Sequence, residues 1–196
     1  MKYFIAALSV FFAKQVSSQE LRLSVDYGYA VATMRDSKAI MLQTGVRGGM
    51  EWTIKKKFYL SVFAGGSLLR YNYTSTTGEA IFNRKYFVML PVSLKKYYPL
   101  AKRSSGFVEV GISPVHFFLN HKEINNGGSN RVEKENNLGW NGAGLLCIGF
   151  RTMITPVLAF DIGLLGQKDF IQSYKRAQDR IRTDRTSLAI GFYRKL

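Results

Sequence analysis

The sequence predicts an all-β fold: an eight-stranded antiparallel up-and-down transmembrane β-barrel. Three observations predict it. Eight segments alternate apolar and polar residues with a period of two, the connections between them are alternately long and short, and aromatic residues gather near the segment ends. Beyond the N-terminus, no stretch approaches the ~18 consecutive apolar residues that a transmembrane helix needs.

Residues 1–18 are predicted to be a cleaved signal peptide, and residues 19–196 the barrel domain. Lys2 supplies a basic start, residues 3–13 a short apolar core, and residues 16–18 compact side chains where cleavage would occur. The alternative for this segment is a first strand or a buried helix. Cys147 is the only cysteine in the sequence, so no disulfide and no cysteine pair for a metal is expected.

The first predicted strand, residues 21–32, shows the alternation clearly. Leu23 and Val25 lie on one face, whereas Arg22 and Asp26 lie on the other among small residues. Successive side chains of a strand point to opposite faces, so we expect the apolar face to meet lipid and the polar face to line the interior. The rival is a soluble lipocalin-like barrel, which would turn the apolar face inward.

The second predicted strand, residues 40–54, repeats the pattern. Val46 and Met50 share the apolar face, and Arg47 and Glu51 share the polar one. An Arg or Lys on the lipid face would cost roughly 2–4 kcal/mol at the bilayer midplane. Arg47 is therefore predicted to point into the barrel.

Six further segments alternate in the same way and are long enough to cross a bilayer at a tilt. They are residues 58–73, 84–97, 107–119, 138–152, 157–167 and 185–196. In the sixth of the eight strands, Leu138 and Trp140 are predicted to face outward together.

Charged residues on the polar faces define a predicted interior cluster: Arg22, Asp26, Arg47, Glu51, Lys95, Glu109, Arg151 and Asp161. Eight strands enclose an interior just wide enough for side chains. Because an unpaired charge there is costly, we expect a mutually paired polar plug. The alternative is a small conducting path or a ligand cavity.

The connections indicate which way the barrel points. If the chain starts in the periplasm, the outer loops are residues 33–39, 74–83, 120–137 and 168–184, and the periplasmic turns are residues 55–57, 98–105 and 154–156. The loop 168–184 carries basic and apolar residues, which suit lipopolysaccharide phosphates, although a solvated loop has the same composition.

The basic excess points to lipid. The formal net charge is +15, and an exported chain meets anionic headgroups rather than nucleic acid. Five turn residues are predicted to contact headgroups: Lys55, Lys56, Lys57, Lys102 and Arg103. The alternative is that basic turns only keep the chain soluble before insertion.

Aromatic residues are predicted to form belts at both membrane interfaces. One belt contains Trp52, Phe58, Tyr59, Tyr97, Tyr98, Phe107, Phe150, Phe192 and Tyr193. The other contains Tyr27, Tyr29, Tyr71, Tyr73, Tyr86, Phe117, Phe118 and Trp140.

Residues 90–98, Leu-Pro-Val-Ser-Leu-Lys-Lys-Tyr-Tyr, resemble the fourth-strand pattern of the PorT-like outer-membrane β-barrel domain, and residues 191–194 resemble its terminal strand. The resemblance covers nearly all of the chain after residue 18. It implies the barrel fold and an outer-membrane location, and it implies no one shared activity.

No catalytic site is predicted. A lipid-modifying enzyme would need a nucleophile beside a base, commonly Ser with His. His116 shares its face with Pro114 and Phe118, Ser113 is on the opposite face, and His121 lies in a loop. No spacing suits a metal, so we expect no cofactor and no metal site.

The expected role is a structural or interaction component of the envelope, with outer-membrane lipids, lipopolysaccharide and other envelope proteins as partners. The alternatives are a PorT-like subunit of a secretion machine, a lipid-modifying enzyme and a small pore. Nothing in the sequence separates the secretion subunit from a lone structural barrel.

Overall fold

The computed structural model describes residues 19–34, 37–55, 57–74, 78–174 and 182–196. The predicted signal peptide and Lys56 lie outside the described residues. The described strands are β1 (Gln19–Met34), β2 (Ser37–Lys55), β3 (Phe58–Thr74), β4 (Ala80–Met89), β5 (Val92–Ala101), β6 (Ser104–Asn125), β7 (Asn130–Met153), β8 (Leu158–Tyr174) and β9 (Arg182–Lys195). No helix in these ranges is long and apolar enough to span a membrane.

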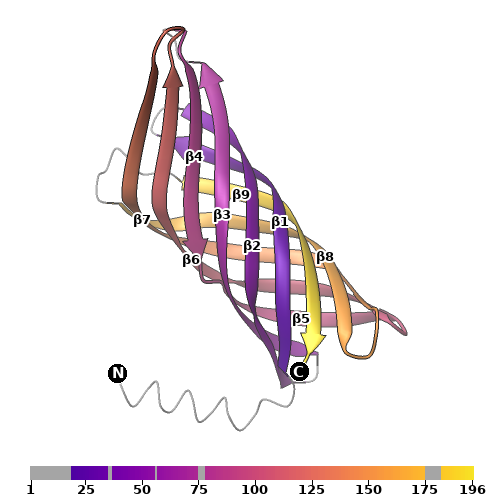
Figure 1. Cartoon of the computed structure of the whole chain (residues 1–196). Coiled ribbons are helices and arrows are strands. Elements are labelled where there is room, and N and C mark those ends of the chain that lie inside the picture. The colour runs from indigo at the N-terminus through magenta and orange to yellow at the C-terminus, as the bar shows by residue number, and fades with distance from the viewer. Residues whose placement is uncertain (1–18, 35–36, 56, 75–77, 175–181) are drawn as a thin grey trace.

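The strands form one closed antiparallel ring, as predicted (Figure 1). Strands that follow one another along the chain pair side by side around the sheet. The last strand, β9, pairs with β1 and closes the ring, with Ile190 opposite Val25. The short turns and the C-terminus lie at one end, which we call the turn end; the opposite end we call the loop end (Figure 1).

β4 and β5 together form one strand of the barrel, which is why nine strands make a ring of eight. Met89 pairs with Gly65 and Val92 with Val62, so the same register to β3 continues across the gap. The gap arises because Pro91 has no N–H to donate to the ladder. The predicted fourth strand, residues 84–97, is thus confirmed as a single interrupted strand.

The alternation of faces follows the prediction. Val25 is 53% exposed and Leu90 52% exposed on the outer surface, whereas Asp26 is 1% exposed inside. Apolar side chains therefore cover the outside of the barrel and charged ones lie within. This arrangement is the opposite of a lipocalin-like barrel.

The prediction of a loop at residues 120–137 is wrong. β6 runs on to Asn125 and β7 begins at Asn130, so this segment is a long hairpin with a short tip. Charge pairs such as Lys122 with Glu133 join its strands. A polar hairpin with water on both faces has no apolar alternation, which is why its composition resembles a loop.

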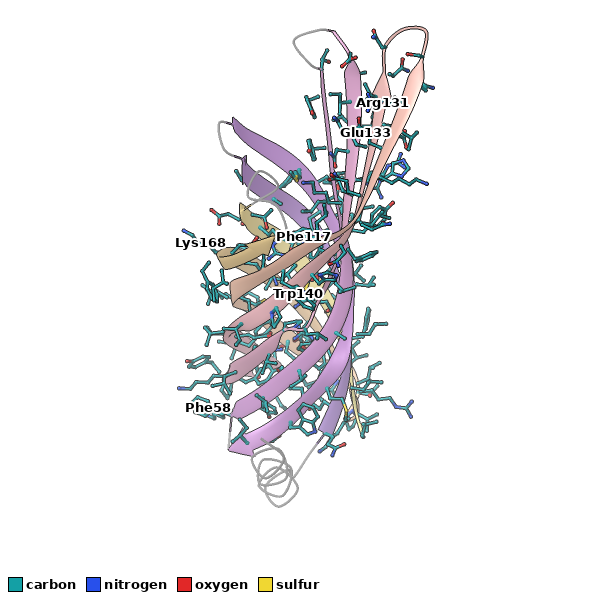
Figure 2. The ribbon with its side chains drawn as sticks, turned by 90° about the vertical axis from the view of Figure 1, so that its left-hand side faces the viewer. Phe58, Phe117, Arg131, Glu133, Trp140 and Lys168 are labelled. Atoms are coloured by element: carbon teal, nitrogen blue, oxygen red, sulfur yellow. The ribbon has the colours of Figure 1, made fainter. Side chains whose placement is uncertain are left out.

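The other predicted loops are also shorter than expected. β3 ends at Thr74 and β4 begins at Ala80, while β8 extends to Tyr174. Together β3, β4, β6 and β7 project beyond the rest of the ring at the loop end (Figures 1 and 2). We call this projection the wall.

The prediction that Leu138 faces outward with Trp140 is wrong. Phe117 pairs with Gly139 and Leu119 with Asn136, so two residues of β7 oppose one of β6. Asn137 has a φ of 56° at this β-bulge. The extra residue shifts the alternation, and Leu138 packs instead against the interior apolar cluster.

Candidate functional site

The structure places all eight residues of the predicted interior cluster inside the barrel. Their relative exposures lie between 0% and 7%: Arg22 2%, Asp26 1%, Arg47 2%, Glu51 0%, Lys95 0%, Glu109 2%, Arg151 7% and Asp161 1%. They come from six different strands, so only the closed ring brings them together.

Lys95 lies at the centre of the cluster near the turn end. Its Nζ donates to Asp161 Oδ2 at 2.9 Å and to the Tyr193 hydroxyl at 2.8 Å. Glu51 Oε2 lies 3.5 Å from the same nitrogen. Burial of an ammonium requires such partners, and here three strands other than β5 supply them.

Arg151 joins three carboxylates. Its Nε donates to Asp161 at 2.9 Å, its Nη1 to Glu20 at 2.8 Å and its Nη2 to Glu51 at 3.3 Å. Its guanidinium carbon lies 3.7 Å from the centre of the Tyr193 ring. A planar five-donor group suits this position because it can bridge several acceptors at once.

Two further pairs extend the cluster. Arg22 Nη1 lies 3.2 Å from Glu109 Oε2, and Ser93 donates to the other Glu109 oxygen at 2.6 Å. Arg47 binds Asp26 with two parallel hydrogen bonds of 2.8 Å. The bidentate pair has the strongest geometry that these side chains allow.

Four aromatic residues of the predicted belts are buried inside instead: Tyr97 (7% exposed), Phe107 (2%), Phe117 (2%) and Tyr193 (1%). Tyr59 and Tyr71, also assigned to the belts, are partly buried and pack against the interior apolar clusters. Tyr97 shares its face with Lys95, and Phe107 shares its face with Glu109. The same alternation that placed the charges inside therefore places these rings beside them. Tyr97 also donates to Glu51 at 2.8 Å, so it belongs to the cluster rather than to a belt.

A second polar group, which was not predicted from the sequence, lies inside the barrel nearer the loop end. Asp169 accepts hydrogen bonds from Asn141 Nδ2 at 2.6 Å, from Thr183 Oγ1 at 2.6 Å and from Arg185 Nη2 at 2.7 Å. Both Asp169 and Thr183 fall within the predicted outer loop 168–184, but the structure places them in β8 and β9. Continuing the alternation of Asp161 past residue 167 would have placed Asp169 inside.

Apolar side chains fill the interior beside this second group. The cluster contains Ala30, Met41, Leu69, Phe87, Met89, Val115, Phe117 and Ala143. The Arg185 guanidinium lies 5.2 Å from the centre of the Phe87 ring. The interior thus combines ion pairs with an apolar layer.

Several buried polar side chains have no hydrogen-bond partner within the described residues. They include Ser24, Gln43, Ser67, Ser113 and Gln167. Buried polar groups normally pair with protein or ordered water. These positions are the parts of the interior where water would bind.

The predicted headgroup residues gather at the turn end. Lys57, Lys102 and Arg103 are exposed. Lys57 has a φ of 71°, and its carbonyl accepts from Tyr97 N at 3.1 Å, which ties this turn to β5. Lys55 belongs to β2 but its side chain is outside the described part, as is all of Lys56.

The recorded contacts of the two histidines are with residues other than serine. His116 stacks on Trp140 with ring centres 4.5 Å apart, and its Nδ1 lies 3.1 Å from the Gly139 carbonyl. His121 Nε2 lies 3.0 Å from Glu123. Ser113 faces the interior, away from both, and no serine is recorded in contact with either histidine among the described side chains. The described residues also contain no group of three or more side chains that could hold a metal.

The fold is similar to that of two solved bacterial proteins. Neisserial surface protein A has 12% identity, with 90% of this chain and 97% of that chain covered and a TM-score of 0.55. The outer membrane protein OprG from Pseudomonas aeruginosa also has 12% identity, with 93% and 97% covered and a TM-score of 0.53. At this identity the likeness shows the barrel fold alone.

No protein-family model matches the sequence, and a search of curated proteins gave no match. The comparisons therefore support a small eight-stranded barrel of the outer-membrane type. They do not show that the chain belongs to the PorT-like family, which residues 90–98 resemble.

Proposed function

We propose that the chain is an integral outer-membrane barrel whose interior is closed by paired side chains, and that it acts as a structural or interaction component of the envelope. The observation that carries the proposal is the combination of an apolar outer surface with a charged, mutually paired interior. A soluble protein has the reverse arrangement.

The outer surface supports the membrane location. Leu23 is 62% exposed, Leu94 50% and Ile148 56%, and they come from strands all around the ring. Apolar surface of this extent is far beyond the patches that soluble monomers tolerate. Exposed rings near both ends, such as Trp140 and Tyr98, suit interfacial belts.

The pairing inside supports a closed lumen. Lys95 and Arg151 have carboxylate partners on other strands, and Arg47 and Asp26 pair with each other. Opening a path through the cluster would separate these charges in a space that offers little water. The apolar layer around Phe87 adds a second barrier to ions.

The basic turn end supports contact with lipid headgroups. Lys57, Lys102 and Arg103 would meet the periplasmic leaflet, and Lys55 and Lys56 belong to the same turn. Each basic residue near an anionic surface contributes about 1 kcal/mol. This contact would help to seat the barrel at a defined depth.

A PorT-like subunit of a secretion machine is the alternative role. The resemblance of residues 90–98 favours it, and the wall offers a surface beyond the membrane for a protein partner. Co-purification from solubilised membranes tests this role. A stoichiometric envelope protein that remains bound would favour the machine subunit over a lone barrel.

Conductance in planar bilayers tests the closed interior. We expect the inserted wild-type barrel to show no stable open level. Replacing Lys95 and Arg151 with Ala should produce one, because it removes the cations that hold three carboxylates in place. A wild-type barrel that conducts steadily would contradict the closed lumen. The location is tested separately by cell fractionation, and recovery of the protein in a fraction other than the outer membrane would contradict it.

A further inference from the structure

We propose that a crevice formed where Arg70 of β3 and Arg84 of β4 lie opposite each other on the outer surface binds the phosphorylated headgroup of an outer-leaflet lipid. This inference rests on the membrane location proposed above. The crevice has a volume of about 490 Å³ and lies toward the loop end. Its lining includes Tyr29, Ile40, Leu42, Arg70, Phe82 and Arg84.

The two arginines are direct cross-strand partners, and both are exposed. Like charges directly opposite one another destabilise a sheet, and the cross-strand partner of Arg70 on its other side, Leu42, carries no charge. A phosphate between the guanidinium groups would turn the repulsion into attraction, because the planar fork of Arg matches phosphate oxygens.

One carboxylate lies beside the arginines. Glu123 is 3.4 Å from Arg84 and 3.0 Å from His121, and its side chain is 39% exposed. Arg70 makes no ion pair within the described ranges. Glu123 thus offsets only one of the two arginine charges, and the crevice keeps a net positive charge.

The basic character continues sideways along the wall. His121 of β6 is the cross-strand partner of Arg84, and Lys134 of β7 is the partner of His121. Partners in an antiparallel pair share a face. A row of four nitrogen-bearing side chains therefore crosses four strands along one line of cross-strand partners, with Arg70 and Arg84 in the crevice.

The position of Arg70 and Arg84 along their strands suits binding of lipid phosphates. Tyr86 lies two residues from Arg84 toward the turn end, with its ring 6.3 Å from that of Phe118. Trp140, at the base of the wall in Figure 2, is 50% exposed. Two residues of strand span about 7 Å, and Phe82 lies the same distance from Arg84 on the other side. The arginines therefore lie within the aromatic belt, at the level of the headgroups.

The apolar part of the lining favours a lipid over a free anion. Tyr29 is 60% exposed, Ile40 73% and Phe82 39%, all beside the two arginines. A free phosphate would leave these side chains uncovered. A lipid would place its phosphate on the arginines and its glycosyl or acyl part against the apolar side chains.

The test measures lipid retained by the purified full-length barrel, using native mass spectrometry after mild detergent exchange. The probes are lipid A with its phosphates and the same lipid A without them. We expect wild type to retain the phosphorylated form preferentially, and Arg70→Gln with Arg84→Gln to bind it at least about tenfold more weakly. Lys122→Gln with Arg131→Gln, which removes the same charge from the wall, is the matched control and should retain wild-type binding.

Each outcome has a defined meaning. Equal binding by the crevice variant and wild type, or an equal loss in the control, would overturn the proposal. Displacement of the lipid by millimolar inorganic phosphate would show a free-anion site instead. If the double variant fails to fold, Arg70→Gln alone carries the test, since Arg70 has no ion pair within the described residues to lose.

Insertion is measured separately, by protease protection in liposomes. A wild-type barrel that inserts but shows no preference for phosphorylated lipid overturns this inference and leaves the proposed function intact. A wild-type barrel that does not insert overturns both.

Discussion

Arg151 illustrates how single residues make a charged interior possible. It reaches carboxylates on β1, β2 and β8 from its own place on β7. Alternation along β7 predicts that Arg151 points inward. Its partners could not be predicted from the sequence, because they depend on the stagger between strands that are distant along the chain.

Arg151→Met is expected to destabilise the barrel by about 3–5 kcal/mol, because it leaves buried carboxylates without their cation. Urea unfolding in lipid vesicles, followed by tryptophan fluorescence, measures the change. Arg131→Met is the control: Arg131 has a side chain 76% exposed and pairs with Glu133 at the surface (Figure 2), so its loss should cost under about 1 kcal/mol. Similar losses in the two variants would contradict a structural role for the interior pairs.

Leu90→Arg tests the assignment of inside and outside. Leu90 is 52% exposed at mid-strand, and an Arg there would cost roughly 2–4 kcal/mol on the lipid face. The matched change is Asp26→Leu with Arg47→Leu, which removes a whole buried pair and leaves neither charge alone. We expect Leu90→Arg to reduce the membrane-inserted yield and the double variant to insert almost normally; equal yields would contradict the assignment.

At the scale of the element, the period of two predicted all eight strands of the barrel, but their ends and irregularities were harder to predict. The hairpin of residues 120–137 lies beyond the lipid-facing part, where both faces are wet and no alternation is needed. The bulge at Asn137 depends on a φ of 56°, which an Asn tolerates but does not require. Interior aromatic residues such as Tyr97 cannot be told from belt residues by ring content alone; the alternation with Lys95 is what places Tyr97 inside.

The interruption between β4 and β5 leads to a prediction about stability. The Pro91 carbonyl accepts from Phe63 N at 3.0 Å, but Pro91 has no N–H to return to Phe63. Pro91→Ala would supply that donor in a ladder whose register is already continuous. We expect a gain of about 1 kcal/mol, seen as a higher urea midpoint.

Pro156→Ala is the control for this effect, since Pro156 lies exposed in a turn. It removes a proline without adding a ladder hydrogen bond. If Pro91→Ala leaves the urea midpoint where it is, the missing hydrogen bond is not what interrupts this strand.

At the scale of the whole molecule, the two ends differ in charge. Exposed residues at the turn end include Lys57, Lys102, Arg103, Arg194 and Lys195, whereas the wall mixes Lys122 and Arg131 with Glu133 and Glu135. The sequence places the turn residues far apart. Closure of the ring gathers them at one rim. At this rim β1 and β9 meet, and Leu196 N donates to the Gln19 carbonyl at 2.9 Å.

This asymmetry predicts that the basic turn controls insertion into anionic membranes. Replacing Lys55, Lys56 and Lys57 with Gln should weaken binding to liposomes that contain anionic lipid, by about 1 kcal/mol for each residue near the surface. The effect should shrink as salt rises, because the charges are exposed and screened.

The matched control changes Lys122, Arg131 and Lys134 to Gln at the opposite end, where the turn-end leaflet is out of reach. Insertion yields with and without anionic lipid, at low and high salt, measure the difference. If the turn variant keeps the lipid and salt dependence of wild type, the basic turn has no anchoring role; if the control loses as much, total charge rather than its position drives insertion.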